Sequence, residues 1–189
     1  MRGKIQLQGS YRLLVSFLLA LGLAGAPLAC GSKTNPSAVR ALPEYDAEQA
    51  TLFGDVFRPE LFGLGSERSV GVDGLLRDRA TVADTVVAAR VVTVSRETRG
   101  AARGYSVVLA PTENALVGPT PSGQLTFEIV ETSPVFGWLE GASGAWGGTR
   151  MLLFLRQFRD GTHFFGCADT EDVRTVVASA PRRRANPAP

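Results

Sequence analysis

The sequence predicts an α+β domain with a small five-stranded antiparallel sheet that curls or closes into a barrel. Five runs rich in β-branched and aromatic residues lie between positions 85 and 167. One amphipathic segment precedes these runs and another follows them. Strands grouped in this way, with a helix before and a helix after, are typical of α+β domains.

The first helix is expected over Asp73–Ala83, where a mostly apolar stripe recurs at helical spacing. The preceding stretch, Glu44–Gly65, mixes aromatic, aliphatic and acidic residues and contains Pro59. It is compatible with a short helix that ends before Pro59 or with a packed irregular segment.

The five predicted strands are Thr85–Ser95, Tyr105–Ala110, Leu125–Glu131, Met151–Phe158 and Thr162–Cys167. In the third strand Leu125, Phe127 and Ile129 alternate with polar residues, which predicts one buried face. The fourth run is almost continuously apolar, as expected of a central strand. Asp160 and Gly161 predict a hairpin turn between the last two strands.

A closing helix is expected over Asp169–Ala180, with Val173, Val176, Val177 and Ala180 on one face. Asp169 is the predicted cap, with Asp172 three residues later. The tail Pro181–Pro189 contains three consecutive arginines and is predicted to be disordered.

A second pattern concerns the first predicted strand and two later segments. The stretch Leu75–Val94, the turn Ala115-Leu116-Val117-Gly118 and the segment Gly148–Leu155 together resemble netrin-like, OB-type barrel domains of exported bacterial proteins. The resemblance implies an OB-like barrel. It also implies one functional alternative, because netrin-like barrels include inhibitors that engage a protease through their N-terminal edge and loops.

The N-terminus has the pattern of an export signal. Arg2, Lys4 and Arg12 precede an uncharged apolar run over Leu13–Leu28. The run ends in Pro27-Leu28-Ala29-Cys30-Gly31, which resembles the lipobox of bacterial lipoproteins. That resemblance implies cleavage before Cys30, a diacylglyceryl group on its thiol and an acyl chain such as palmitate on its new amino group. An ordinary signal peptide cleaved near Ala26 or Ala29 is the alternative.

The predicted organisation is therefore a signal peptide at 1–29, a lipid-anchored flexible linker at 30–43, one globular domain at 44–180 and a disordered tail at 181–189. Lipid on Cys30 would hold the protein to a membrane of the cell envelope, since two or three acyl chains give durable attachment. Gly31 takes the place of the Asp that often retains lipoproteins at the inner membrane, which favours the outer membrane where a cell has two.

Charge argues against a nucleic-acid partner. Without residues 1–29 the chain keeps 17 basic and 18 acidic residues, so the predicted mature protein is nearly neutral. It also lacks a basic patch interleaved with aromatic residues.

No catalytic, cofactor or metal site is predicted. His163 is the only histidine, and a hydrolytic triad would have to combine it with Ser106 or Ser143 and a distant acid. The residues around Ser143 do not form the Gly-x-Ser-x-Gly nucleophile elbow, and one histidine does not make a zinc site. We therefore expect His163 to be a structural residue of a strand or hairpin beside aromatic side chains, and Cys167 to be a buried small hydrophobic residue.

The glycine-rich segment Gly137–Gly148 carries Trp138 and Trp146 and follows Phe136. As a loop between strands it is the best candidate for a recognition surface that contacts an envelope protein or a glycan. In the alternative, these aromatic residues cover one end of the barrel.

Taken together, these features favour a membrane-anchored, non-catalytic binding or structural module. The alternatives are an envelope hydrolase and a netrin-like inhibitor or regulator of an extracytoplasmic enzyme.

Overall fold

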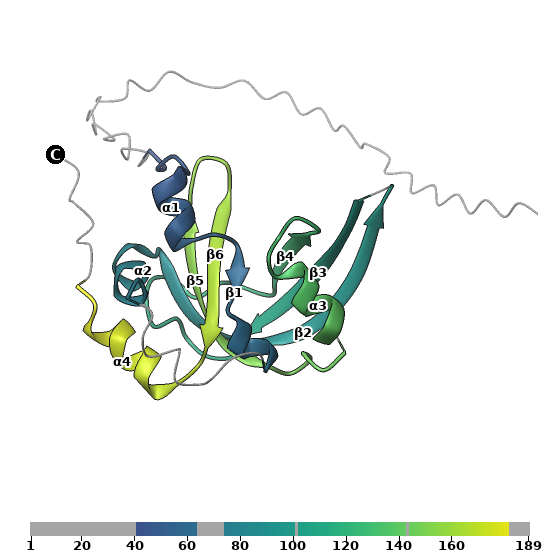
Figure 1. The fold of residues 1–189 in the computed structure, drawn as a ribbon. Helices are drawn as coiled ribbons and strands as arrows, with labels where there is room; N and C mark the ends of the chain where they lie inside the picture. The colour runs from purple at the N-terminus through teal and green to yellow at the C-terminus, as the bar shows by residue number, and fades with distance from the viewer. Residues whose placement is uncertain (1–40, 64–73, 101, 143, 182–189) are drawn as a thin grey trace, which may run out of the picture. The chain divides into compact units, whose positions relative to one another are not determined.

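The structure is a computed structural model that describes residues 41–63, 74–100, 102–142 and 144–181. Contacts within the chain place every described residue in one compact unit. The elements of this unit are α1 (Ala47–Leu52), β1 (Val56–Phe57), the 3-10 helix η1 (Pro59–Phe62), α2 (Leu76–Val82), β2 (Thr85–Arg99), β3 (Ala102–Pro111), β4 (Leu125–Val130), α3 (Phe136–Ala142), β5 (Arg150–Gln157), β6 (Thr162–Ala168) and α4 (Glu171–Ser179) (Figure 1).

The strands form one curled sheet in the order β1-β6-β5-β2-β3-β4. All neighbours from β6 to β4 are antiparallel, whereas β1 runs parallel to β6. The curl brings the far strands together, because the Phe127 ring on β4 lies 4.2 Å from the Phe164 ring on β6, centroid to centroid. The α+β class and the curled sheet are confirmed, and the sheet is a half-barrel.

The prediction of five antiparallel strands is wrong, since the described sheet has six strands and is mixed. The missed strand, β1, is only two residues long, which is too short to show an alternating pattern. Its Phe57 packs over Gly166 of β6, where a methyl group would lie 2.5 Å from Cδ1 of the Phe57 ring. Because Gly166 has no side chain, the Phe57 ring can pack against its backbone where β1 pairs with β6.

The curl depends on β2, which is long enough to pair with two neighbouring strands. Residues 85–90 pair with β5 and residues 89–99 pair with β3, so the two pairings overlap at Ala89 and Arg90. The register shifts between Val91 and Thr93, which leaves Val92 exposed at a β-bulge. A bulge bends its strand and increases the local twist, which turns β3 and β4 around toward β6.

The sheet separates two apolar layers, and β5 is buried on both of its faces. Met151 and Leu153 point to the inner layer with Trp146 and Leu139 of α3. Leu152 and Phe154 point to the outer layer. This explains the continuous apolar run of β5, since alternate residues enter different layers.

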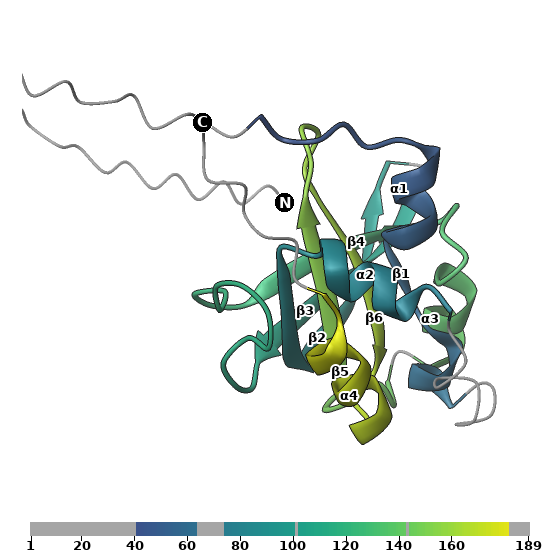
Figure 2. The ribbon, with the colours of Figure 1, turned by 90° about the vertical axis from the view of Figure 1, so that its left-hand side faces the viewer.

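Helices α2 and α4 cover the outer layer side by side (Figure 2). Both predicted helices are confirmed, but Asp169 does not cap α4. The cap is Thr170, whose hydroxyl accepts a hydrogen bond from the Val173 backbone N–H, while Asp169 accepts from the guanidinium of Arg174. Thr170 has the extended backbone conformation that a cap residue requires.

Glu44–Gly65 contains both a helix and extended chain, namely α1, β1 and η1. Helix α1 has no buried residue and is fixed at its C-terminus by Arg79 of α2. The Arg79 guanidinium donates to the carbonyls of Leu52 at 2.7 Å and Thr51 at 3.2 Å. These carbonyls belong to the last turn of α1, where backbone carbonyls have no hydrogen-bond donor within the helix.

Candidate functional site

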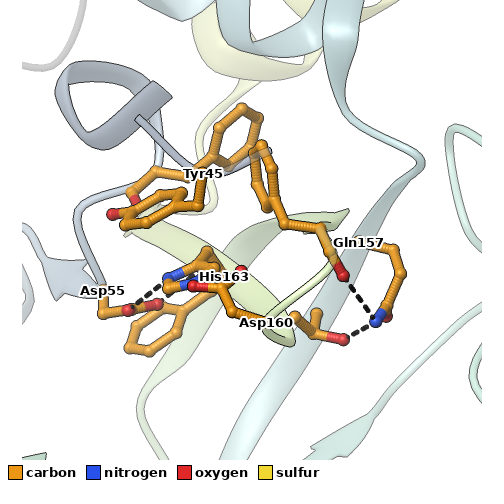
Figure 3. Close-up of polar contacts among 9 residues, drawn as sticks. Tyr45, Asp55, Gln157, Asp160 and His163 are labelled. Atoms are coloured by element: carbon orange, nitrogen blue, oxygen red, sulfur yellow. Dashed lines mark hydrogen bonds and ion pairs between the residues drawn. The ribbon is translucent and has the colours of Figure 1, made fainter. Parts of the chain in front are cut away.

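A cluster of interacting polar side chains surrounds His163, near the start of β6 (Figure 3). Asp55 comes from the turn between α1 and β1, and Asp160 from the hairpin that joins β5 to β6. The Nδ1 atom of His163 lies 2.7 Å from Oδ2 of Asp55, and Nε2 lies 3.2 Å from Oδ2 of Asp160. The imidazole is therefore held between two carboxylates of separate segments.

Asp55 is the only described non-glycine residue with a positive φ, at 52°. Its backbone N–H donates to the carbonyl of Phe164, and its Oδ1 accepts from the Phe164 N–H at 3.0 Å. The strained left-handed conformation lets one residue bind both backbone groups of Phe164 and the ring of His163.

Aromatic rings close the other sides of the histidine. The Tyr45 ring stacks on the imidazole at 3.6 Å between centroids and 6° between planes, and Phe158 meets its edge. The Tyr45 hydroxyl donates to the Phe53 carbonyl at 2.6 Å. Burial, and then the nearby Asp55 and Asp160 carboxylates, raise the pKa of Tyr45 above its usual value because each opposes formation of a phenolate.

The cluster fixes the ring but does not build a nucleophile–base pair. Both imidazole nitrogens face carboxylates, whereas a triad needs one of them to meet a hydroxyl or thiol. Ser106 is buried on β3, and Ser143 lies outside the described residues. Within the described ranges, no group of three or more histidine, cysteine or acidic residues could hold a metal ion. The prediction that His163 lies beside aromatic residues is confirmed.

The proposed recognition residues do not lie together on a loop. Phe136 and Trp138 belong to α3, so the expectation of a loop is wrong for this part of the segment. Phe136 and Leu139 are both buried on one side of α3, and this packing outweighs the low helix propensity of Gly137 and Gly141.

Trp146 is 2% exposed, and its indole N–H donates to the Leu61 carbonyl at 2.9 Å. It stacks on Phe62, which also contacts the half-buried Trp138. Two of the three predicted residues, Phe136 and Trp146, are thus core residues, as in the alternative in which they cover one end of the barrel. Trp138 is the only one that keeps a substantial surface for a partner.

Cys167 is buried in the outer layer with residues of β5 and α4, as predicted. Cys30, the export segment, the linker up to residue 40 and the arginines of the tail lie outside the described residues. Among the helices that the structure does describe, none is long and apolar enough to cross a membrane.

Sequence reasoning missed a second site, a cavity of about 250 Å³ beside the outer layer. Its walls are the end of α2, Val117, the end of β5 and the chain at Leu42. Two charged residues, Asp84 and Arg156, line it together with apolar side chains. No sequence signal points to this cavity, because its walls come from four segments that are distant along the chain.

We found no family model, curated protein or solved structure that matches the chain.

Proposed function

We propose that this protein is an envelope lipoprotein, anchored through lipid on Cys30, whose domain is a non-catalytic binding or structural module. The observation that carries the module part is the environment of His163. A residue that acts as a base needs a free nitrogen directed at its substrate, and here both nitrogens face carboxylates. His163 instead joins the segment before β1 to the β5–β6 hairpin.

The anchoring part of the proposal rests on the export pattern and on the residues before Cys30. Anchored by two or three acyl chains, the domain would stay at the membrane and meet envelope proteins, glycans or small solutes there. In a cell with two membranes, Gly31 favours the outer one.

For the domain itself we propose an OB-type barrel. The order β6-β5-β2-β3-β4, with α3 between β4 and β5, supports this proposal, because an OB-fold is a five-stranded, partly open Greek-key barrel. The turn Leu116–Gly118 also packs against β2, with the Leu116 N–H donating to the Val86 carbonyl. The same topology keeps the netrin-like inhibitor as the second candidate, whereas the environment of His163 argues against a hydrolase.

The anchor is tested by the intact mass of protein extracted from membranes, with wild type beside Cys30→Ser. We expect a mass equal to residues 30–189 plus diacylglycerol and an acyl chain. We also expect the variant to lose both the lipid and its membrane attachment. An unlipidated mature chain with a Cys30–Cys167 disulfide would overturn the anchor, although it would leave the domain's role as a binding module open.

The non-catalytic role is tested with His163→Asn in assays of envelope peptidase and esterase substrates. Asparagine can still donate to one carboxylate but supplies no base. We expect wild type and variant to be equally inactive, and wild-type turnover that the variant loses would establish the hydrolase instead.

A further inference from the structure

We infer that β4 is a docking edge for a second copy of this chain, and that two β4 strands pair antiparallel across a two-fold axis. Within the described residues β4 is the last strand of the sheet and pairs with β3 alone. This inference goes beyond the proposed role as a binding module, because it needs neither the lipid anchor nor a ligand.

The backbone of β4 offers hydrogen-bonding groups on the side that faces away from β3. A methyl group on Gly104 would lie 3.1 Å from the Ile129 carbonyl oxygen, so this carbonyl points toward β3. In an antiparallel pair, successive residues of a strand direct their N–H and C=O groups alternately toward the neighbouring strand and away from it. The backbone groups of Thr126 and Glu128 therefore point outward.

Natural edge strands usually carry features that prevent further pairing, and β4 lacks several of them. Leu125–Val130 contains neither lysine nor proline, and its register with β3 is continuous. Val130 is 56% exposed. The other edges differ, since β1 has two residues and the part of β2 beyond β5 carries Arg96, which forms an ion pair with Glu140 of α3. We therefore place the additional strand at β4.

The sequence of β4 is complementary to itself in one register. In a two-fold antiparallel pair, opposite residues share a face, so the axis passes through one residue. An axis at Glu128 would set two carboxylates opposite each other, which destabilises a sheet. An axis at Thr126 would overlap only residues 125–127 of the strand. An axis at Phe127 overlaps residues 125–129 and sets Thr126 opposite Glu128.

The register centred on Phe127 uses the outward backbone groups and an aromatic ring. Each Thr126–Glu128 pair exchanges two hydrogen bonds, and the two-fold axis creates this pair twice. At the axis the two Phe127 residues form a non-hydrogen-bonded pair, in which side chains lie closest. The Phe127 ring packs on Phe57 and Phe164 of its own copy but is only half-buried, so part of its surface is left for a partner.

The size of the contact sets the expected affinity. One strand of six residues is a small contact beside the roughly 1,200–2,000 Å² of a standard interface. We therefore expect a reversible dimer with a dissociation constant in the micromolar range. Sedimentation equilibrium of the full chain in density-matched detergent, from about 1 μM to 1 mM, measures it. A monomer over this whole range would overturn the inference.

A proline on the edge tests the outward backbone groups. Thr126→Pro removes an N–H that bonds to the second copy but not to β3, and edge strands accept proline at such positions. Thr126→Val is the matched control, because it changes the side chain and keeps the N–H. We expect Thr126→Pro, with folding checked by circular dichroism, to weaken association about tenfold or more and Thr126→Val to associate like wild type.

Cysteine cross-linking tests the register, and it decides the question if Thr126→Pro does not fold. Thr126→Cys and Glu128→Cys are carried by separate, differently tagged copies that are expressed together and oxidised. Opposite residues of a hydrogen-bonded pair have Cα atoms about 5.5 Å apart, which suits a disulfide, whereas diagonal neighbours are about 7–8 Å apart. Either variant alone offers only diagonal neighbours. Ser95→Cys with Glu97→Cys, at the same spacing on β2, is the control.

We expect a disulfide-linked dimer from the mixed Thr126→Cys and Glu128→Cys copies, and little from either variant alone or from the β2 control. Equal association of Thr126→Pro and wild type would overturn the inference. So would a mixed pair that cross-links no more than the single variants, because the interface would then lie elsewhere. Neither result bears on the lipid anchor, which the mass measurement tests separately.

Discussion

At the scale of single residues, the structure assigns unusual backbone or protonation properties to a few positions. Asp55 adopts a left-handed conformation to hold His163 and Phe164. Gly118, also at positive φ, brings the turn after β3 against the start of β2. Tyr45 keeps its proton in the vicinity of two carboxylates. Each of these properties can be measured with one substitution.

The raised pKa of Tyr45 predicts a loss of stability in alkali. An unfolded chain releases this phenolic proton near pH 10, whereas the folded chain retains it to higher pH. Because the folded state then binds more protons than the unfolded state, its stability falls as pH rises through 10. Absorbance titration at 295 nm of wild type and Tyr45→Phe gives the pKa by difference, and a value at or below 10 would contradict the assignment.

Gly118→Ala is expected to destabilise the domain by more than about 1 kcal/mol. A methyl group there would lie 1.9 Å from the Asp84 carbonyl oxygen, and φ is 69°. Gly137→Ala is the control, because Gly137 has open space around its Cα and lies in a helix. Urea unfolding of both variants provides the comparison, and equal stability of the two would show that the turn can move away.

At the scale of helices and strands, the sequence predicted the elements that have a recognisable pattern of apolar residues. All five long strands and the helices α2 and α4 appear close to their expected positions, because each has a run of strand-forming residues or an apolar stripe at helical spacing in the sequence. The sequence did not predict the elements that form only through contacts with residues distant along the chain. The strand β1 exists because Gly166 leaves room for Phe57, and α3 forms where Phe136 and Leu139 reach the core.

The same limit applies to the candidate site. That His163 lies in a strand beside aromatic residues follows from its neighbours in the sequence. Its contact with Asp55, which is 108 residues away, follows only from the docking of β1. The prediction of Asp169 as the cap of α4 failed for a local reason. Asp169 and Thr170 are both favourable cap residues, and Asp169 instead forms an ion pair with Arg174.

Docking of β1 can be tested with Gly166→Ala. The added methyl group would meet the Phe57 ring at 2.5 Å, and overpacking of this kind costs about 1–3 kcal/mol. Gly166→Ala combined with Phe57→Leu should recover part of the loss, since leucine lacks the clashing ring. A double variant no more stable than Gly166→Ala would show that Phe57 is not the obstacle.

At the scale of the whole domain, β5 couples the two apolar layers. Leu152 and Leu153 are neighbours in sequence, yet each is fully buried in a different layer. A strand shared in this way should make the layers unfold together, as small domains usually do.

We therefore expect Leu152→Ala and Leu153→Ala each to cost about 2–5 kcal/mol and to shift two probes equally. Fluorescence of Trp138 and Trp146, which both pack in the inner layer, reports that layer. Far-ultraviolet circular dichroism reports mainly the helices, of which α2 and α4 cover the outer layer. Transitions that separate in either variant would show that the layers unfold independently.

The left-handed backbone at Asp55 also restricts which substitutions the chain can accept there. Glycine and asparagine tolerate the conformation, but only aspartate brings a charged carboxylate to His163 as well as an acceptor for the Phe164 N–H. In a saturation library screened for folded protein, position 55 should consequently be among the least permissive exposed or half-buried sites. In a second library that varies positions 55 and 163 together, replacements that survive at 55 should be enriched for compensating changes at 163. Covariation of these two positions would then be a criterion for recognising chains with the same arrangement.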